Sequence, residues 1–318
     1  MRAIQVVERT GPDGVRVRQI PEPGRRPDEV LVQVRAAGVT FPDLLISHGK
    51  YQESPDLPFV LGGEFAGIVR EAPADSSFAP GDRVTCSSAH CAFAELAAVP
   101  YERVLPLPAH VSFEVGACLP ANYLTMLFGF LQRGRLRPGE RVLVHGASGG
   151  VGVASVQLAR ALRASQVIAV TSNPSPALES ADVIPASGFV DTVAAMTNGA
   201  GVDIVVDPVG GDRLAESIRC LAPGGRALII GFASGTIPTI DVNLTQDPGV
   251  DLVGVGWGSH LAHHPEALGQ EWDRLMQLTH AHPYVRPSID RILRLEEAAD
   301  ALRALESRQA HGRLVLCP

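Results

Sequence analysis

The sequence predicts an α/β protein in which a β-rich part is followed by a doubly wound parallel sheet. At 318 residues the chain is longer than one hydrophobic core usually supports, so two domains are expected. The first 110 residues or so contain frequent short strand patterns, whereas strands and helices alternate from about Phe113 onward. Within that second part, an apolar strand runs directly into a glycine-rich turn and a helix between Arg141 and Leu162.

The N-terminal part is predicted to form a small barrel or sandwich, because its strands follow one another almost without helices. Strands are expected at 1–7, 15–20, 29–34, 65–70, 82–85, 93–99 and 103–107. Glycines and prolines at 11–14 and 21–27 separate the first three. One helix is expected near 42–48, because Thr40 suits an N-cap, Pro42 an early helical position and Asp43 a capping-box partner.

The second part is predicted to build a parallel sheet from buried strands that alternate with helices. Val142, Leu143 and Val144 form an apolar run typical of a strand buried on both faces. Further strands are expected at 166–171, 202–206, 226–232 and 251–256, with helices at 151–162, 189–196 and 212–221. The apolar run 117–131 is interpreted as a buried helix, and helices near 266–279 and 295–305 precede a closing strand at 313–316.

The glycine turn predicts a dinucleotide site. Gly146, Gly149, Gly150 and Gly152 stand between strand and helix, although Ala147 holds the first glycine position of the usual G-x-G-x-x-G pattern. Gly149 would let the backbone approach a pyrophosphate, and Gly152 would let the helix pack closely on the strand. The N–H groups of the helix N-terminus would then face the phosphates. The turn residues assigned to the cofactor are Gly146, Ala147, Ser148, Gly149, Gly150, Val151 and Gly152.

The composition argues against several classes of function. The net charge of −7 and the absence of a basic cluster disfavour a nucleic-acid partner. No signal peptide is expected, and the apolar run 117–131 is shorter than the ~20 residues of a membrane span. Five scattered cysteines do not form a disulfide framework. We therefore expect a soluble cytoplasmic protein without a membrane partner.

Several motifs, taken in their order and spacing, resemble one known family. The matching segments are 38–43 (GVTFPD), 49–51 (GKY), 57–67 (LPFVLGGEFAG), 122–125 (NYLT), 145–152, 207–211 (DPVGG), 230–235 (IGFASG) and 311–313 (HGR). Over essentially the whole chain, the sequence resembles the medium-chain dehydrogenase/reductases, specifically the zinc-free, zeta-crystallin-like quinone oxidoreductase branch.

This resemblance implies a GroES-like β-barrel catalytic domain formed by both chain ends, with a Rossmann domain inserted between them. The expected boundaries are 1–120 and 257–318 for the catalytic domain and 121–256 for the NADP-binding domain. It further implies NADPH as hydride donor, a small-molecule quinone or conjugated carbonyl as acceptor in the cleft between the domains, and a homodimer joined at the edges of the parallel sheets. An exposed last strand of that sheet would need such a cover.

No metal is expected. Zinc-dependent relatives have a cysteine and a histidine at positions that hold Thr40 and Gly63 in this chain. The cluster of Cys86, His90 and Cys91 has a spacing that matches no familiar zinc site, and the histidines at 260, 263 and 264 are interpreted as a solvated helix start. Without a Lewis acid, alcohol oxidation of the zinc-dependent kind would lose its means of activating the hydroxyl.

The resemblance also assigns individual residues. Thr40 stands where the family usually has an asparagine near the nicotinamide, so it is both a candidate catalytic residue and a candidate helix cap. Tyr51 matches a pocket tyrosine that either binds the carbonyl oxygen or forms an apolar wall, and Trp257 would line the same pocket or be purely structural. Further candidates for the cofactor are Asn122, Thr125, Pro208, Val209, Phe232, Ala233 and Ser234.

Cofactor choice is expected to favour NADPH. The second strand of the parallel sheet is followed by Thr171, Ser172 and Asn173, with no acidic residue to bind a ribose 2′-hydroxyl or to repel a 2′-phosphate. The basic residue that the family supplies just afterwards is absent. Arg313 is the candidate replacement; the alternative is that it only decorates the last strand.

The leading functional prediction is metal-free hydride transfer from NADPH to a quinone. No Ser-His-Asp set is evident in the sequence, and no general acid is assigned, since solvent can protonate a hydroquinone anion. Two alternatives remain open: reduction of the C=C bond of alkenals, enones or enoyl thioesters with the same cofactor, and an NADPH-binding sensor or structural protein with little turnover.

Overall fold

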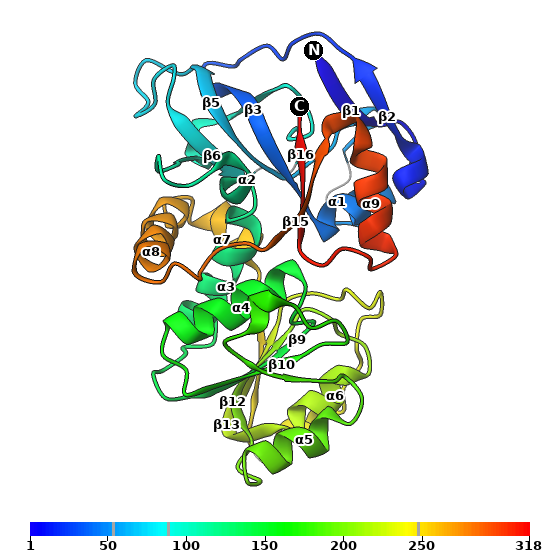
Figure 1. Cartoon of the computed structure of the whole chain (residues 1–318), viewed down its shortest axis with the longest axis vertical. Coiled ribbons are helices and arrows are strands. Elements are labelled where there is room, and N and C mark those ends of the chain that lie inside the picture. Colours follow the sequence, from blue (N-terminus) through cyan, green and yellow to red (C-terminus); the bar gives the residue numbers. More distant parts are fainter. Residues whose placement is uncertain (53–54, 88–89, 247–248) are drawn as a thin grey trace. The chain divides into compact units, whose positions relative to one another are not determined.

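The structure, a computed structural model, describes residues 1–52, 55–87, 90–246 and 249–318. The chain separates into two compact units, each described here by itself. The first unit contains Met1–Ala121 and Pro287–Pro318, and the second contains Asn122–Arg286. Both chain ends therefore contribute to the first unit, as the resemblance implied (Figure 1).

The second unit is built on a six-stranded sheet in which every neighbouring pair is parallel. Its order is β11-β10-β9-β12-β13-β14, so the third, second, first, fourth, fifth and sixth strands of the unit lie side by side. This is the order of a Rossmann fold. The strands are β9 (Arg141–His145), β10 (Gln166–Val170), β11 (Asp182–Ile184), β12 (Val202–Asp207), β13 (Leu221–Ile229) and β14 (Asp251–Gly254).

Helices connect these strands, as Figure 1 shows. They are α4 (Gly150–Ala161), α5 (Phe189–Met196) and α6 (Arg213–Ile218), with α3 (Thr125–Phe128), α7 (Trp257–His263) and α8 (Ala267–Ala281) in the same unit. Leu143, Ile168 and Val205 are fully buried and belong to one apolar core with residues of α5 and α6. A sheet covered by helices on both faces explains why its central strands are continuous apolar runs.

The first unit contains a largely antiparallel sheet in the order β15-β16-β3-β5-β6-β8, with β7 also paired to β3. Its strands are β3 (Glu29–Val39), β5 (Glu64–Glu71), β6 (Arg83–Ser87), β7 (Leu96–Pro100), β8 (Val104–Pro106), β15 (Ile289–Arg294) and β16 (Arg313–Cys317). A smaller sheet joins β1 (Arg2–Val6) to β2 (Val15–Gln19) and β4 (Phe59–Val60). The last strand, β16, pairs with β3, so the C-terminus completes a sheet begun near the N-terminus.

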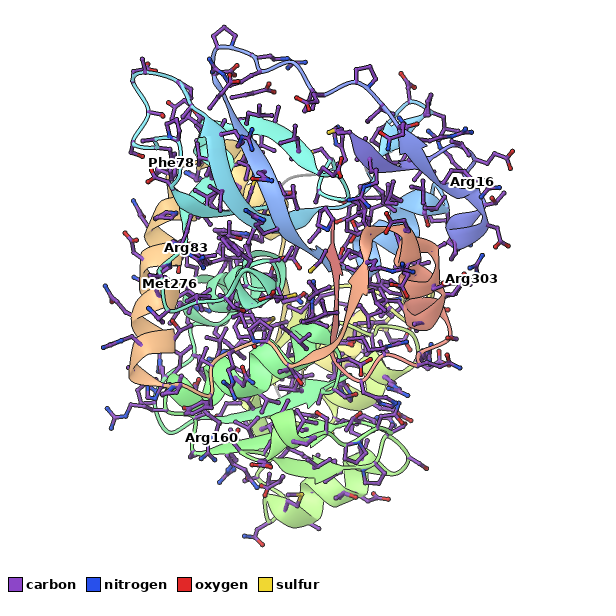
Figure 2. The ribbon with its side chains drawn as sticks, turned by 45° about the horizontal axis from the view of Figure 1, so that its top comes forward. Arg16, Phe78, Arg83, Arg160, Met276 and Arg303 are labelled. Carbon is purple, nitrogen blue, oxygen red and sulfur yellow. The ribbon has the colours of Figure 1, made fainter. Side chains whose placement is uncertain are left out.

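Among its described residues, the first unit contains the α-helices α1 (Phe41–Ser47), α2 (Phe113–Gly116) and α9 (Ala298–Glu306). The predicted capping box of α1 is confirmed, because the Thr40 side chain accepts from the Asp43 N–H and the Asp43 side chain accepts from the Thr40 N–H. On α9, Arg303, labelled in Figure 2, donates to Asp13 at 2.8 Å, so the C-terminal segment contacts the N-terminal one.

The structure corrects the expected boundary between the domains. Residues 257–286 were expected in the catalytic domain, but they belong to the second unit. Trp272 of α8 is 1% exposed, and Glu271 beside it accepts from the Gln132 side chain at 2.9 Å. The apolar face of α8 is therefore buried in the unit that contains α3, and the chain returns to the first unit only at Pro287.

The segment 117–131 is also different from the expected single helix. It is divided into a π-helical turn at Pro120–Leu124, α3, and a second π-helical turn at Gly129–Arg133. Pro120 has no N–H to continue an α-helical ladder, and the second turn begins at Gly129 and is followed by Gly134. The apolar pattern correctly indicated burial but could not indicate the change of helical pitch.

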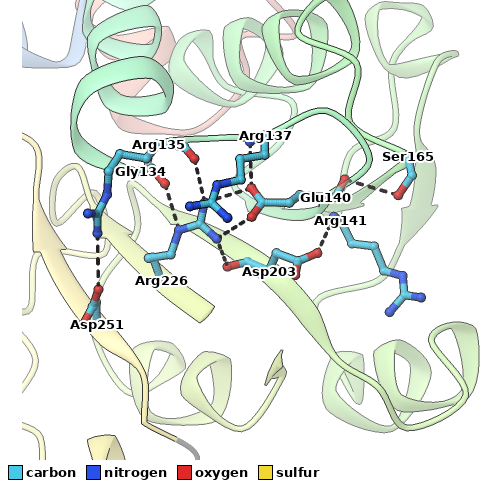
Figure 3. A network of polar contacts seen from close by, with 9 residues as sticks. All are labelled: Gly134, Arg135, Arg137, Glu140, Arg141, Ser165, Asp203, Arg226 and Asp251. Atoms are coloured by element: carbon cyan, nitrogen blue, oxygen red, sulfur yellow. Dashed lines mark hydrogen bonds and ion pairs between the residues drawn. The ribbon is translucent and has the colours of Figure 1, made fainter. Parts of the chain in front are cut away.

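A buried arginine holds the amino-terminal edge of the parallel sheet, as Figure 3 shows. Arg226 of β13 donates to both carboxylate oxygens of Glu140, at 2.9 and 2.8 Å, and to the carbonyl oxygens of Gly134, Arg135 and Asp203. Partial burial raises the pKa of Glu140, but hydrogen bonds from Arg226 and from the Arg137 N–H lower it overall. This network fastens the segment leading into β9 onto the sheet.

Within the described ranges, no helix combines the length and the apolar character that crossing a membrane requires.

Candidate cofactor site

The glycine turn after β9 has the geometry of an anion-binding helix start. Gly146 has a φ of +56°, which L side chains rarely adopt, and it turns the chain directly after His145. Gly149 is the N-cap of the twelve-residue helix α4 and has no side chain to occupy the helical N–H groups. Those groups are therefore available to a phosphate at the carboxyl end of the sheet.

Two glycines of the turn are required for different reasons. A Cβ at Gly152 would lie 2.2 Å from the Gly146 oxygen and 2.5 Å from the Ala147 Cα, so the helix packs too closely on the turn for any side chain. A Cβ at Gly149 would meet only the Gly146 oxygen, at 3.3 Å. Gly152 is thus needed by the fold, whereas the space beside Gly149 remains open for a ligand.

Three loops meet at this edge of the sheet. A Cβ at Gly146 would lie 3.1 Å from Val209 Cγ2, so the glycine turn adjoins the loop after β12. That loop in turn accepts backbone hydrogen bonds from the loop after β13: Ala233 N–H to Pro208 O at 3.0 Å and Ser234 N–H to Val209 O at 2.9 Å. The structure therefore brings together Val209, Pro208, Ala233 and Ser234 as the sequence predicted for one site. β9 and β12 are the neighbours at which the strand order reverses, where such folds bind ligands.

The second strand also reaches this site. Ser148 Oγ lies 2.8 Å from Thr171 Oγ1, which links the glycine turn to the end of β10. Thr171 Oγ1 additionally accepts from the Asn173 N–H at 3.1 Å. Ser172 and Asn173 follow as exposed residues, so their side chains are free to meet a ribose substituent.

The remaining candidates of the second unit lie in other elements. Asn122 is 8% exposed, and its buried Nδ2 has no hydrogen-bond partner in the described structure. Trp257 is also 8% exposed and packs its ring 5.3 Å from that of Phe128 and 5.9 Å from that of His260. Thr125 begins α3, and Phe232 is 37% exposed in the loop after β13.

Thr40, Tyr51 and Arg313 belong to the first unit. Tyr51 is 37% exposed, whereas Thr40 is buried and donates its hydroxyl to Asp43 Oδ2 at 2.6 Å. Burial raises the pKa of Asp43 to about 6, against the opposing effect of the Thr40 hydrogen bonds. The capping role of Thr40 is thus a structural fact, and its catalytic role stays a prediction.

Arg313 does not have the exposed environment expected of a phosphate ligand, which argues against its assignment to the cofactor. Its side chain is 8% exposed and forms a buried ion pair with Glu64, which is fully buried. Burial raises the pKa of Glu64 to about 7, against the attraction of the Arg313 guanidinium. Because a carboxylate already neutralises Arg313, the ion pair joins β16 to β5 across the intervening strand β3, and the guanidinium has less charge to offer a cofactor.

The first unit does not offer a fit for the catalytic zinc of related dehydrogenases. Thr40 Oγ1 is engaged with Asp43, Gly63 has no ligand atom, and the two oxygens of Glu64 accept from Arg313 and from the Ala121 N–H. Among the described residues, no group of three histidine, cysteine or acidic side chains is arranged to hold a metal ion. Cys86, His90 and Cys91 are therefore not arranged as a metal site either.

Sequence reasoning missed a set of buried polar residues beneath the site. His145, Asp207 and Ser217 come from β9, β12 and α6, and their side chains gather behind the glycine turn. The sequence showed no Ser-His-Asp set because only the fold brings these residues together. His145 and Asp207 could have been noticed in the sequence, because each is a polar residue at the end of an apolar strand.

Comparisons with known proteins agree with this architecture. Residues 26–109 match the model of the alcohol dehydrogenase GroES-like domain, and residues 150–279 match the model described as zinc-binding dehydrogenase. The quinone oxidoreductase-like protein 2 homolog of Nematostella vectensis is 32% identical over 91% of this chain and 81% of its own length. Rat quinone oxidoreductase is 31% identical over 99% of this chain and 97% of its own.

Among solved structures, mycobacterial Rv1454c in complex with NADPH has a TM-score of 0.91 and 30% identity, with full coverage of both chains. The glycine turn on a 3-2-1-4-5-6 sheet, the GroES-like first unit and these relatives lead to one conclusion. The chain belongs to the quinone oxidoreductase branch of the medium-chain dehydrogenase/reductase superfamily.

Proposed function

We propose that this protein is an NADPH-dependent quinone oxidoreductase that transfers a hydride without a metal. The observation that carries the proposal is the set of three loops at the carboxyl edge of the parallel sheet, gathered around the open N-terminus of α4. Relatives named quinone oxidoreductase and a neighbour solved with NADPH support the same cofactor and reaction class.

The residues present fit a bound dinucleotide. The N–H groups at the start of α4 would hold the pyrophosphate, and Gly149 would leave room for it. Ser172 and Asn173 would donate to the 2′-phosphate, and Asn122 and Thr125 would bind the carboxamide end. Bound NADPH supplies the hydride.

The first unit would provide the acceptor site. We assign Tyr51 to hydrogen bonding with a quinone oxygen. The hydroxyl proton of Thr40 is already donated to Asp43, so Thr40 holds the start of α1 instead of binding the acceptor oxygen. The chain's main contribution is to orient the acceptor and exclude water during transfer. A strong general acid is unnecessary because solvent can protonate the hydroquinone oxygens.

The experiment is steady-state NADPH oxidation by purified protein with a panel of quinones, alkenals, enones and enoyl thioesters. We expect turnover with quinones, and we expect it to persist in strong chelator. Turnover confined to the conjugated carbonyls would indicate the C=C reductase instead. Tight NADPH binding without oxidation by any acceptor would indicate a sensor or structural protein, and loss of activity in chelator would contradict the metal-free reaction.

We further propose a homodimer joined through β14, in the cytoplasm. In the described part of the second unit, β14 is paired on one side only, with β13. Leu252 on this strand is 42% exposed, and Ile237 and Val242 in the preceding loop are 72% and 78% exposed. An unpaired strand edge beside apolar side chains favours pairing with a second copy.

A further inference from the structure

The buried trio of His145, Asp207 and Ser217 lies where two cofactor loops begin. His145 is the last residue of β9 and precedes the glycine turn, and Asp207 is the last residue of β12 and precedes the 208–211 loop. All three side chains are at most 1% exposed. Burial this complete prevents Ser217 from acting as a nucleophile toward any substrate, so the trio is not a hydrolytic site.

Hydrogen bonding selects one tautomer of His145. Ser217 Oγ donates its only proton to the Arg213 carbonyl oxygen at 2.7 Å. His145 Nε2 lies 2.7 Å from the same Oγ, so this nitrogen must carry the proton and donate it. Nδ1 is then an unprotonated nitrogen, and it has no hydrogen-bond partner among the described residues.

Asp207 holds the neighbouring loop. Its Oδ1 accepts from the N–H groups of Val209 at 2.8 Å and Gly210 at 2.9 Å, which fixes the start of the 208–211 loop. Its Oδ2 is buried without a hydrogen-bond partner in the described structure. Asp207 therefore serves its own loop, and among the described residues its carboxylate accepts no hydrogen bond from His145.

We propose that His145 is a positioning residue for cofactor binding: its Nε2–H donates to Ser217 and so ties the end of β9, where the glycine turn begins, to α6, while Asp207 on the neighbouring strand orders the 208–211 loop. The proposal rests on the proposed function, because it assigns both loops to NADPH. It connects helix α6 to the cofactor through two side chains, neither of which touches the ligand.

The surroundings keep His145 neutral. Burial lowers its pKa to about 4, the Asp207 carboxylate opposes this effect, and Arg213 on α6 adds to it. The ring of Phe189, on α5, packs nearly perpendicular to the imidazole of His145, with the ring centroids 4.8 Å apart. At neutral pH the imidazole therefore stays uncharged, and its tautomer is set by Ser217.

The test compares variants at the Nε2 end of the ring. His145→Phe keeps an aromatic ring but removes both nitrogens. We expect it to raise the Kd for NADPH about tenfold, the effect of losing one hydrogen bond, here the bond to Ser217. His145→Gln carries an amide that can donate to Ser217 in place of Nε2–H, and we expect it to restore the Kd to within about threefold of wild type. Saturating kcat should change less than the Kd in both variants.

Two further measurements separate positioning from general stability. Thr197→Val removes another buried hydroxyl of this unit, at the end of α5, and should lower stability without changing the Kd. Nitrogen NMR of the wild-type protein should show His145 protonated on Nε2, with the tautomer equilibrium changed by Ser217→Ala.

These outcomes decide the inference. An Nδ1–H tautomer in the wild type, or an unchanged Kd in folded His145→Phe, would overturn the positioning role. So would a Kd in Thr197→Val that rises as much as in His145→Phe. NADPH binding and the tautomer are measured without turnover, so a wild type that binds NADPH but reduces no quinone would contradict only the proposed function. Failure to bind NADPH at all would overturn both.

Discussion

Residues close together in this protein differ in whether they are needed for ligand binding or for packing of the fold. Gly149 and Gly152 lie three residues apart in one turn, yet the backbone closes around the second and leaves the first open. In the first unit, Thr40 caps α1 and Arg313 pairs with Glu64, so both side chains already have partners within the fold. This distinction leads to three predictions at the residue scale.

Gly149→Val is expected to abolish NADPH binding while the protein stays folded. The φ of −77° at Gly149 suits any residue, and its Cβ would meet only one backbone oxygen, but a branched side chain would occupy the place of the pyrophosphate. Fluorescence titration with NADPH and thermal unfolding would measure the two effects. Gly152→Val is the matched variant, and it should fail to fold; normal affinity in folded Gly149→Val would contradict the site.

Arg313→Ala is expected to destabilise the first unit by about 3–5 kcal/mol, because it leaves the buried carboxylate of Glu64 without its partner. The ratio of dissociation constants for NADPH and NADH should stay the same in a folded sample. Denaturant unfolding and cofactor titration would test both statements. A reduced preference for NADPH in the variant would instead support Arg313 as a ligand of the cofactor.

Acid is expected to destabilise the second unit through His145. The pKa of His145 is about 4 in the folded protein against 6.5 ordinarily, so the unfolded chain binds the proton first as pH falls. The contribution to stability is fully present above pH 6.5 and is lost as the pH falls toward 4, by up to about 3 kcal/mol. Unfolding free energies across this range should be flatter in His145→Gln than in wild type; parallel curves would refute the assignment.

At the scale of elements, the two edges of the parallel sheet have different tasks. The carboxyl edge carries the three loops of the candidate site, whereas the amino edge is fastened by the Arg226 network (Figure 3). The loops at the carboxyl edge hydrogen-bond to one another, whereas the amino edge is held by one side chain that reaches several segments. The buried guanidinium of Arg226 satisfies one carboxylate and three carbonyl groups there.

Arg226→Met is expected to lower the free energy of unfolding by about 3 kcal/mol or more, because Glu140 would remain partly buried without its partner. The control is Arg135→Met. Arg135 is 70% exposed and lies 3.7 Å from Asp251, so its loss should cost less than about 1 kcal/mol. Denaturant unfolding would compare the two, and equal losses would mean that the network contributes no more than a surface ion pair.

At the scale of the whole molecule, the proposed dimer depends on the exposed edge of β14. Leu252→Lys is expected to shift the protein toward monomer, since a charge on an edge strand opposes pairing with another chain. Size-exclusion chromatography with light scattering would measure this shift. Ile292→Lys on β15 is the control, because Ile292 is 58% exposed on a strand of the other unit. A dimer unaffected by Leu252→Lys would place the interface elsewhere.

The sequence by itself determined the fold class, the family and the location of the glycine turn. Strand 141–145, the turn and helix 150–161 are contiguous, and their periodicity and glycine spacing are local properties. The Thr40–Asp43 capping box was predictable for the same reason, since its partners are three residues apart.

Only the tertiary structure decided which distant residues meet. Arg313 and Glu64 are 249 positions apart and His145 and Ser217 are 72, so no spacing rule connects them. The domain boundary likewise depended on where α8 buries Trp272, because an amphipathic helix indicates a buried face without identifying the surface that covers it. Charge and hydrogen-bond partners are properties of the packed neighbourhood, and that neighbourhood exists only once the strands are side by side.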